Sequence, residues 1–441
     1  MAPRQIATEI LTRVYKDNVF VDVLMHREFH RSDLSNLDKS FISELVHGTL
    51  RWQGKLDWIL KQFYQGDFEK CPRIIKIILE ASLYQILYMS KTPEFAAVNE
   101  GVRLAQKMKG RYWGNRVNAI LRNYLRQRDC LKYPDLAENP IESISVRYSH
   151  PQWLVKRWIE RYGVEETQLL CASNNEIPDL TLRVNPLKTS SDRVIHELTT
   201  NGITIEAVDE LERFLNVSHT FDIAVIPGFQ KGYFTVQDVS AGLVGLLLDP
   251  LPGETILDLC AAPGGKSTHI AELTEDHCTL IAVDQNRQRL NLLKQNIRRL
   301  DLSSIHPVQA DATMIPTHLV DKVLVDAPCS GLGVIAKRSD LRWKRTPEDI
   351  EILSRLQRQL IQNAAKLVKP GGILVYSTCT IEPEENESVI EEFLRQHSEF
   401  LLDIPTNRIP EKYISESFFI KILPHKHQID GSFAARFVRK K

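Results

Sequence analysis

The stretch "LDLCAAPGGKSTHIAEL", residues 257–273, places a glycine-rich turn between a β-rich run and a helical run. Gly264 and Gly265 permit positive φ angles and a close approach of the backbone to a ligand. The helix that follows begins with N–H groups that have no partner inside the helix. A strand, a turn of this kind and a helix in succession predict a ligand-binding unit of an α/β domain.

The spacing around this turn narrows the choice of ligand. The turn lacks the G-x-G-x-x-G pattern of dinucleotide-binding folds. Residues 264–267, "GGKS", end like a P-loop, but Cys260 stands where the first glycine of that motif belongs. Because neither diphosphate-binding motif is complete, we predict a ligand that carries a nucleoside without a diphosphate.

From about Tyr233 onward, the β-rich runs "ETILDLC", "LIAVD", "KVLVD" and "ILVYSTC" alternate with helical runs such as "RQRLNLLKQNIRRL". This alternation predicts an α/β doubly wound, Rossmann-like sheet whose site lies beyond the carboxyl ends of its strands. Acids fall at four of those ends: Asp258, Asp284, Asp311 and Asp326. Asp284 is in the place of an acid that binds a ribose diol, and Asp311 is placed to reach an adenine edge.

The chain is expected to be multidomain. Apolar residues recur at helical spacing from Gln5 to about Gln127, which predicts an all-α domain over residues 1–135. The Pro- and acid-bearing segment 131–143 is the predicted linker. Residues 144–232 are predicted to form a small α/β module with a β-α-β unit, and residues 233–441 the doubly wound domain.

Composition excludes several classes of protein. With 43% apolar and 25% charged residues, the 441-residue chain is neither disordered nor repetitive. Its seven cysteines are scattered without a C-x-x-C pair, which argues against a disulfide framework or a zinc site and favours the cytoplasm. The two histidines of "HKH" (425–427) lack further spaced ligands, so we expect no metal. We also expect no signal peptide and no membrane span.

Charge is balanced overall but unevenly spread. Residues 1–150 hold 23 Lys and Arg against 17 Asp and Glu, a net charge of +6 that the remainder offsets. The segment Arg103–Lys132 has nine basic residues and one acid, with Tyr112, Trp113 and Tyr124 between them. Such a segment is either a phosphate-binding surface with stacking groups or a solvated helix face.

Four motifs then lead to a family. "DLCAAPGGK", "DAPCSG", "YSTCTIEPEENE" and "VQDVSA" together resemble the RNA cytosine-C5 methyltransferases that use S-adenosylmethionine. "FAAVNEGVRLAQ" resembles the helical RNA-binding fold of the antitermination factor NusB, and "RYSHPQWLVKRW" lies between the two parts. Nearly the whole chain thus resembles the bacterial Sun/Fmu branch, which methylates a cytosine of 16S ribosomal RNA.

The resemblance implies roles for individual residues. It implies that Cys379 is the nucleophile, that Cys329 assists release, and that the partner is 16S ribosomal RNA, with no DNA and no membrane partner; we further expect a monomer. It also implies the set of residues that bind S-adenosylmethionine: Cys260, Ala261, Ala262, Pro263, Gly264, Gly265, Lys266, Asp284, Asp311 and Asp326.

The chemistry explains why two thiols are useful. C5 of cytosine is too electron-poor to attack a methylsulfonium, so a thiolate must first add at C6, after which C5 becomes nucleophilic. The adduct must then lose the C5 proton and expel the thiolate. Chemistry alone does not choose between Cys329 and Cys379 as attacker. Asp326 is expected to hold N3 or the exocyclic amine of the base.

Alternatives remain at this stage. One is an inactive RNA-docking scaffold, although a scaffold has no need of Cys379, Cys329 and Asp326 together. Others are an enzyme that acts on another RNA, a thiol redox protein, and a DNA cytosine methyltransferase in which the Pro-Cys thiol attacks. The basic segment 336–345, with five bases and one acid, is predicted to follow RNA phosphates or to be a solvated loop.

Overall fold

The computed structural model describes residues 2–17, 19–31, 33–208, 211–218, 223, 226–315, 318–405 and 407–441. The chain forms two compact units. The first consists of Met1–Glu176 together with Arg338–Lys344, and the second of Ile177–Lys337 together with Arg345–Lys441. A short segment of the C-terminal half of the chain therefore belongs to the first unit.

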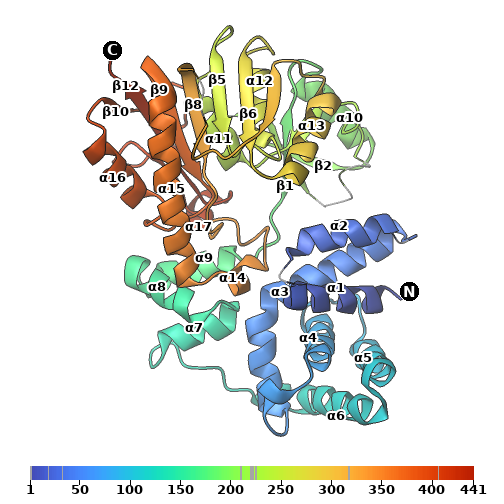
Figure 1. Ribbon diagram of the computed structural model, residues 1–441. Helices are drawn as coiled ribbons and strands as arrows, with labels where there is room; N and C mark the ends of the chain where they lie inside the picture. The colour runs from blue at the N-terminus through green and yellow to red at the C-terminus, as the bar shows by residue number, and fades with distance from the viewer. Residues whose placement is uncertain are drawn as a thin grey trace. The chain divides into compact units, whose positions relative to one another are not determined.

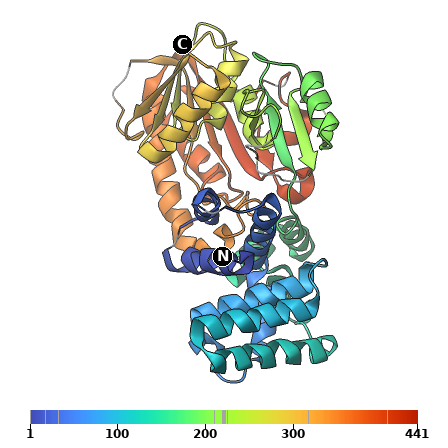
Figure 2. The ribbon, with the colours of Figure 1, turned by 90° about the vertical axis from the view of Figure 1, so that its right-hand side faces the viewer.

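The first unit is helical, as predicted for residues 1–135, and it extends to Glu176, into the range 144–232 that was predicted as the small α/β module. Its N-terminal part packs amphipathic helices around one apolar core, and α5 and α6 lie side by side within it (Figure 2). The six helices of this part are α1 (Pro3–Asp17), α2 (Val21–Arg31), α3 (Asn36–Phe63), α4 (Arg73–Tyr88), α5 (Glu94–Lys109) and α6 (Arg111–Gln127).

Four more helices belong to the first unit: α7 (Pro140–Tyr148), α8 (Gln152–Tyr162), α9 (Val164–Ser173) and α14 (Leu341–Lys344). Helix α7 begins inside the segment 131–143 that the sequence predicts as a linker. The Asn139 side chain accepts a hydrogen bond from the Glu142 N–H, and Pro140 occupies the first turn, so both residues favour a helix start here.

The second unit contains a small four-stranded sheet of order β2-β3-β1-β4, in which every pairing is antiparallel. Helix α10 (Ser191–Thr200) connects β1 to β2, and β3 lies between those two strands, so the predicted β-α-β unit is a split one. The strands are β1 (Leu180–Val184), β2 (Thr204–Ala207), β3 (Phe214–Ser218) and β4 (Phe234–Val236).

The large sheet of the second unit has the order β10-β12-β9-β8-β5-β6-β7, with β11 paired to β12 (Figure 1). The five strands from β9 to β7 are parallel, and β12 joins them antiparallel. The strands are β5 (Thr255–Leu259), β6 (Thr279–Asp284), β7 (Ile305–Gln309), β8 (Val320–Asp326), β9 (Val368–Thr378), β10 (Phe400–Asp403), β11 (Ile420–Ile422) and β12 (Ser432–Arg439).

This order confirms the predicted doubly wound, Rossmann-like fold. The chain adds β6 and β7 on one side of β5 and then returns to add β8 and β9 on the other. Ligands of such sheets bind beyond the carboxyl ends of the strands at the point where the order reverses. That point lies here between β5 and β8.

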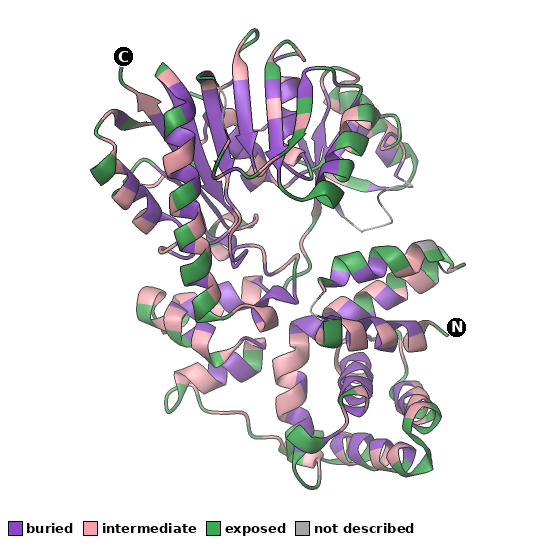
Figure 3. Ribbon diagram, in the orientation of Figure 1, coloured by how far each residue is buried: buried purple, intermediate pink, exposed green. Residues whose placement is uncertain are grey.

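Helices cover both faces of the large sheet. Ile256, Leu324 and Val375 face one core, which they share with α11 (Val239–Leu248), α12 (Gly265–Leu273) and α13 (Arg287–Leu300). Leu257 and Val323 face the other core, which they share with α15 (Pro347–Leu367) and α16 (Glu387–Gln396). Figure 3 shows the central strands as largely buried, as expected for a parallel sheet covered on both sides. Helix α17 (Pro424–His427) also belongs to the second unit.

Across the part of the chain that the structure describes, we find no helix with the length and apolar character needed to cross a bilayer.

Candidate active site

The glycine-rich turn connects β5 to α12. Cys260 and Gly264 both have positive φ angles, 68° and 104°. A Cβ atom on Gly264 would lie 2.3 Å from Leu293 Cδ1, so α13 packs where a side chain would otherwise stand. Only glycine fits this position, and the turn brings its backbone to the carboxyl edge of the sheet as predicted.

Asp258 and Asp284 lie beside this turn. Asp258 is fully buried; its Oδ2 accepts a hydrogen bond of 2.5 Å from Ser267 Oγ. Burial raises the pKa of Asp258 to about 7. Asp284 accepts from the Ala262 N–H at 3.2 Å and from the Asn286 N–H at 2.8 Å. Asp258 is thus joined to the first turn of α12, and Asp284 fixes the backbone of the glycine-rich turn.

Asp311 is placed differently. It follows β7 and is exposed, and its Oδ1 accepts hydrogen bonds from the N–H and the hydroxyl of Thr313 at 2.9 and 2.7 Å. These bonds lower the pKa of Asp311. Its carboxylate is thus an ionised, solvent-facing group at the end of the third strand from the switch point.

Asp326 and Lys266 form an ion pair at the switch point. Lys266 Nζ donates to Asp326 Oδ2 at 2.8 Å, and Ser377 Oγ donates to Asp326 Oδ1 at 3.0 Å. Burial opposes the charge on Lys266, but the nearby carboxylate of Asp326 outweighs it and raises the pKa of Lys266. The end of β8 is therefore joined to the glycine-rich turn on one side and to β9 on the other.

Cys329 and Cys379 meet just beyond this ion pair. Their Sγ atoms are 3.1 Å apart, and the Cys379 N–H donates to Cys329 Sγ at 3.3 Å. The hydrogen bond to Cys379, burial and nearby negative charge raise the pKa of Cys329 well above that of an ordinary thiol. Burial also raises the pKa of Cys260 to about 12, which leaves that predicted cofactor contact a neutral thiol.

Curated relatives match this chain from end to end. A probable ribosomal RNA small subunit methyltransferase B of Synechocystis sp. is 40% identical, covering 99% of both chains. A probable enzyme of the same name from Bacillus subtilis is 36% identical, covering 99% of this chain and 98% of the relative. The chain belongs to the ribosomal RNA small subunit methyltransferase B family.

Family models and solved structures agree with this assignment. The model of the 16S rRNA methyltransferase RsmB/F matches residues 245–438, the NusB family residues 1–126, and the RsmF/B-like ferredoxin-like domain residues 150–224. The crystal structure of PH0851 is similar with a TM-score of 0.83 and 27% identity, covering 100% of this chain and 99% of that one. NSun6 from Pyrococcus horikoshii with SFG gives 0.60 and 26%, covering 66% and 98%.

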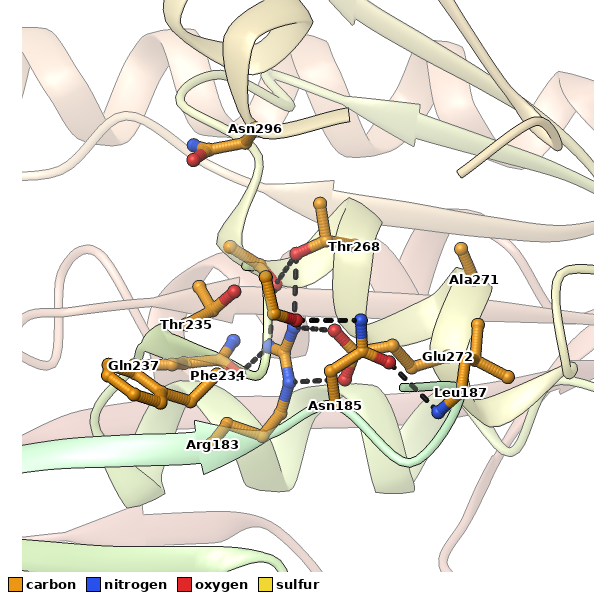
Figure 4. Close-up of polar contacts among 12 residues, drawn as sticks. Arg183, Asn185, Leu187, Phe234, Thr235, Gln237, Thr268, Ala271, Glu272 and Asn296 are labelled. Atoms are coloured by element: carbon orange, nitrogen blue, oxygen red, sulfur yellow. Dashed lines mark hydrogen bonds and ion pairs between the residues drawn. The ribbon is translucent and has the colours of Figure 1, made fainter. Parts of the chain in front are cut away.

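Within this member of the methyltransferase B family, the site depends on a residue that the sequence did not single out. Arg183 of β1 is fully buried and makes a bidentate ion pair with Glu272 of α12, with both contacts at 2.8 Å (Figure 4). It also donates to the Gly265 carbonyl at 3.0 Å and to Gln237 of the "VQDVSA" motif. The small sheet therefore supports the start of α12.

A second unforeseen group is Glu385, which lies in the turn before α16 and is fully buried. It accepts hydrogen bonds from Ser330, the residue after Cys329. A buried carboxylate surrounded by donors is not visible in a sequence, because Ser330 is 55 positions away. The described residues contain no group of three or more metal-ligating side chains.

The prediction for the basic segment 336–345 is wrong, because most of its charges have partners in the protein. Lys337 pairs with Asp238 and Asp430, and Arg345 donates to the Ser330 carbonyl at 2.8 Å. In the first unit, the fully buried Arg342 donates to backbone carbonyls such as that of Ser149 at 3.0 Å. Of the five bases, Arg338 is exposed, Arg342 is buried, and the other three are partly buried in contact with protein acceptors.

The basic segment Arg103–Lys132 has the opposite character. Eight of its nine bases are exposed on α5, α6 and the residues just after them, and Arg116 is partly buried. Tyr112 is 62% exposed and lies beside Trp113, but Tyr124 is buried against Phe63, so the prediction of Tyr124 as a stacking group is wrong. This surface is available to an anionic partner.

Proposed function

We propose that the protein transfers a methyl group from S-adenosylmethionine to C5 of a cytosine in 16S ribosomal RNA, through a covalent bond between Cys379 and C6. The observation that carries this proposal is the pair of thiols from neighbouring strand ends, 3.1 Å apart, beside the ion pair of Lys266 and Asp326. Two thiols suit a reaction that needs one group to attack and another to assist release. Family membership supports ribosomal RNA as the substrate.

The residues around the glycine-rich turn fit the cofactor. Asp258 Oδ1 is buried without a hydrogen-bond partner among the described residues, which leaves an acceptor for a ligand group. Asp284 and residues 260–266 would hold S-adenosylmethionine, and Asp311 would lie toward the adenine end of the cofactor. Bound there, the cofactor supplies an electrophilic methyl group. The similar NSun6 structure contains SFG, an analogue of this cofactor.

The chain's own groups carry the remaining steps. The Cys379 thiolate adds to C6, and the electron pair of the C5–C6 double bond makes C5 nucleophilic. Asp326, oriented by Lys266 and Ser377, holds the polar edge of the base and stabilises charge as the thiolate adds. After C5 has taken the methyl group, the thiolate of Cys329 accepts the proton from C5, the C5–C6 double bond re-forms, and the Cys379 thiolate leaves C6.

The exposed Lys and Arg side chains of α5 and α6 support RNA as the partner, because such side chains neutralise phosphates and release the counterions that were bound to them. Replacing Lys109, Arg111 and Arg126 together by Gln removes three such charges. The slope of log affinity against log salt for RNA should then fall in magnitude by about 2. Filter binding across a salt series measures this, and an unchanged slope would assign these residues to a solvated face only.

The proposal is tested on ribosomal RNA itself. Bisulfite sequencing should find one cytosine of 16S RNA protected from deamination in cells with the wild-type protein, and unprotected in cells with Cys379→Ala. Protection in another RNA instead would favour a different RNA substrate. If no cytosine depends on the protein, the inactive docking scaffold becomes the better account.

A further inference from the structure

Glu385 occupies a position that joins the two cysteine loops. Its Oε1 accepts a 2.8 Å hydrogen bond from the Ser330 N–H, and its Oε2 accepts a 2.5 Å hydrogen bond from the Ser330 hydroxyl. Gln357 Nε2 donates to the same Oε1 at 3.0 Å and to the Pro328 carbonyl at 2.9 Å. The carboxylate therefore fixes the backbone of Ser330, just after Cys329, and Gln357 fixes that of Pro328, just before it.

The same cluster reaches the other cysteine. The Ser330 hydroxyl lies 2.8 Å from Thr380 Oγ1, and Thr380 directly follows Cys379. The backbone of Glu385 is itself fixed, since its carbonyl accepts a 2.6 Å bond from the Tyr376 hydroxyl of β9. One fully buried side chain thus sets the distance between the two loops that present the thiols.

We propose that Glu385 is a positioning residue for the second half of the reaction: through Ser330 it holds Cys329 beside Cys379, where Cys329 can reach the proton that C5 must lose. The proposal rests on the proposed function, because it presupposes that Cys379 is the attacking thiol. Glu385 touches neither the substrate nor a thiol, and it acts through Ser330.

The charge of Glu385 supports this role. Burial raises the pKa of Glu385, but its contacts with Ser330 and Gln357 are all made by donors, which suits a carboxylate rather than a carboxylic acid. A carboxylate this close to Cys329 disfavours the Cys329 thiolate and helps to raise the pKa of that thiol. The reactivity of the Cys329 thiol therefore reports on the charge of Glu385.

Other charged and titratable groups also face the thiols. Lys266 lies near Cys379, and the proximity of that thiol contributes to the raised pKa of Lys266. Tyr376 is buried beside Cys329, and Arg345 donates to the Cys329 carbonyl at 3.4 Å. None of these is altered by replacing Glu385 with Gln, which preserves shape and lets the new amide donate to the Ser330 hydroxyl.

The first experiment needs neither RNA nor cofactor. The rates of Cys329 and Cys260 alkylation by iodoacetamide are measured by peptide mass spectrometry from pH 7 to 9 in the full-length protein, a range below the raised pKa of Cys329 in which its rate follows the thiolate fraction. In Glu385→Gln the Cys329 rate should rise about tenfold at each pH while the Cys260 rate stays unchanged. A looser structure would instead raise both rates. Glu391→Gln, an exposed change on α16, is the matched control and should leave both rates unchanged.

The second experiment is a double-mutant cycle on adduct release. Glu385→Gln keeps a partner for Ser330 and should slow turnover little, whereas Glu385→Ala removes both Ser330 bonds and should slow turnover about tenfold and accumulate protein–RNA adduct while preserving the first methyl transfer. In the Cys329→Ala background Glu385→Ala should have no further effect, because both changes act on one step. Additive effects, or an unchanged rate of Cys329 alkylation in Glu385→Gln, would overturn the proposal. If Cys379→Ala still methylates RNA, the proposed function fails instead, and the alkylation result stands independently.

Discussion

The carboxyl edge of the large sheet has two halves that are built differently. At the ends of β5 to β7, Asp258 bonds to Ser267 of the following helix and Asp311 to Thr313 of its own turn, whereas Asp284 bonds to Asn286 of its own turn and to the Ala262 N–H of the neighbouring turn. At the ends of β8 and β9, every functional side chain bonds across the strands, as Asp326 does with Ser377. The half that we propose for the cofactor, the cofactor half, is thus held mainly within strand–turn–helix units with one bond between two turns, whereas the half that we propose for the target base, the base half, is held by bonds between β8 and β9.

This difference predicts how far the effect of a substitution spreads in each half. A change in the cofactor half alters one turn, so its effect stays with cofactor affinity or local stability. A change in the base half disturbs the neighbouring loop as well, since Cys329, Ser330 and Glu385 form one connected cluster with β9. Effects there should be larger and less additive.

The largest expected effect in this comparison is that of Lys266→Met, which removes the cation paired with Asp326. Losing a preorganised charge at the reacting base should lower the methyl-transfer rate about 10²–10³-fold. Single-turnover assays at saturating cofactor and RNA measure it. Lys366→Met, an exposed change on α15, should leave the rate as in the wild type. A loss that saturating cofactor restores would mean that Lys266 acts in cofactor binding alone and not on the base.

A smaller effect is expected from Asp258→Asn, which should change how the free energy of unfolding depends on pH. Because burial raises the folded-state pKa of Asp258 to about 7 from 3.8, the folded protein binds the proton more tightly than the unfolded chain. The free energy of unfolding of the wild type relative to the variant should therefore fall by about 2–3 kcal/mol between pH 5 and 7.5. Urea unfolding at the two pH values measures the difference, and a pH-independent difference would contradict it.

The smallest effects concern cofactor affinity. Asp284→Ala should weaken binding of S-adenosylmethionine by about 1–3 kcal/mol, because a buried charged acceptor is lost. Asp311→Ala should cost less, about 1 kcal/mol or below, since an exposed carboxylate is screened by water. Isothermal titration calorimetry ranks the two. Equal losses would mean that burial does not separate these acids.

The sequence predicted the cofactor half well because its determinants are contiguous. "LDLCAAPGGK" specifies the strand, the turn that only glycine permits and the helix start, and all three appear where expected. The base half was predicted only as far as its motifs reach. Glu385 and Arg183 were missed because their partners, Ser330 and Glu272, lie 55 and 89 positions away.

Charge density alone proved a poor guide to exposure. The bases of Arg103–Lys132 lie mostly on the surface of α5 and α6, whereas those of 336–345 bond to carboxylates and backbone carbonyls. Helical spacing explains the first case, because the basic residues alternate with apolar ones that face the core. In the second case the acceptors come from distant parts of the chain, which local composition cannot reveal.

The central claim is that Cys379 attacks and Cys329 assists release, and a single denaturing gel tests it most directly. Each variant is incubated with labelled RNA and S-adenosylmethionine and then denatured. Cys379→Ala should give no methylation and no adduct, because C5 never becomes nucleophilic. Cys329→Ala should accumulate a denaturant-stable protein–RNA complex after at most one turnover. An adduct with Cys379→Ala and none with Cys329→Ala would contradict the account and make Cys329 the attacking thiol.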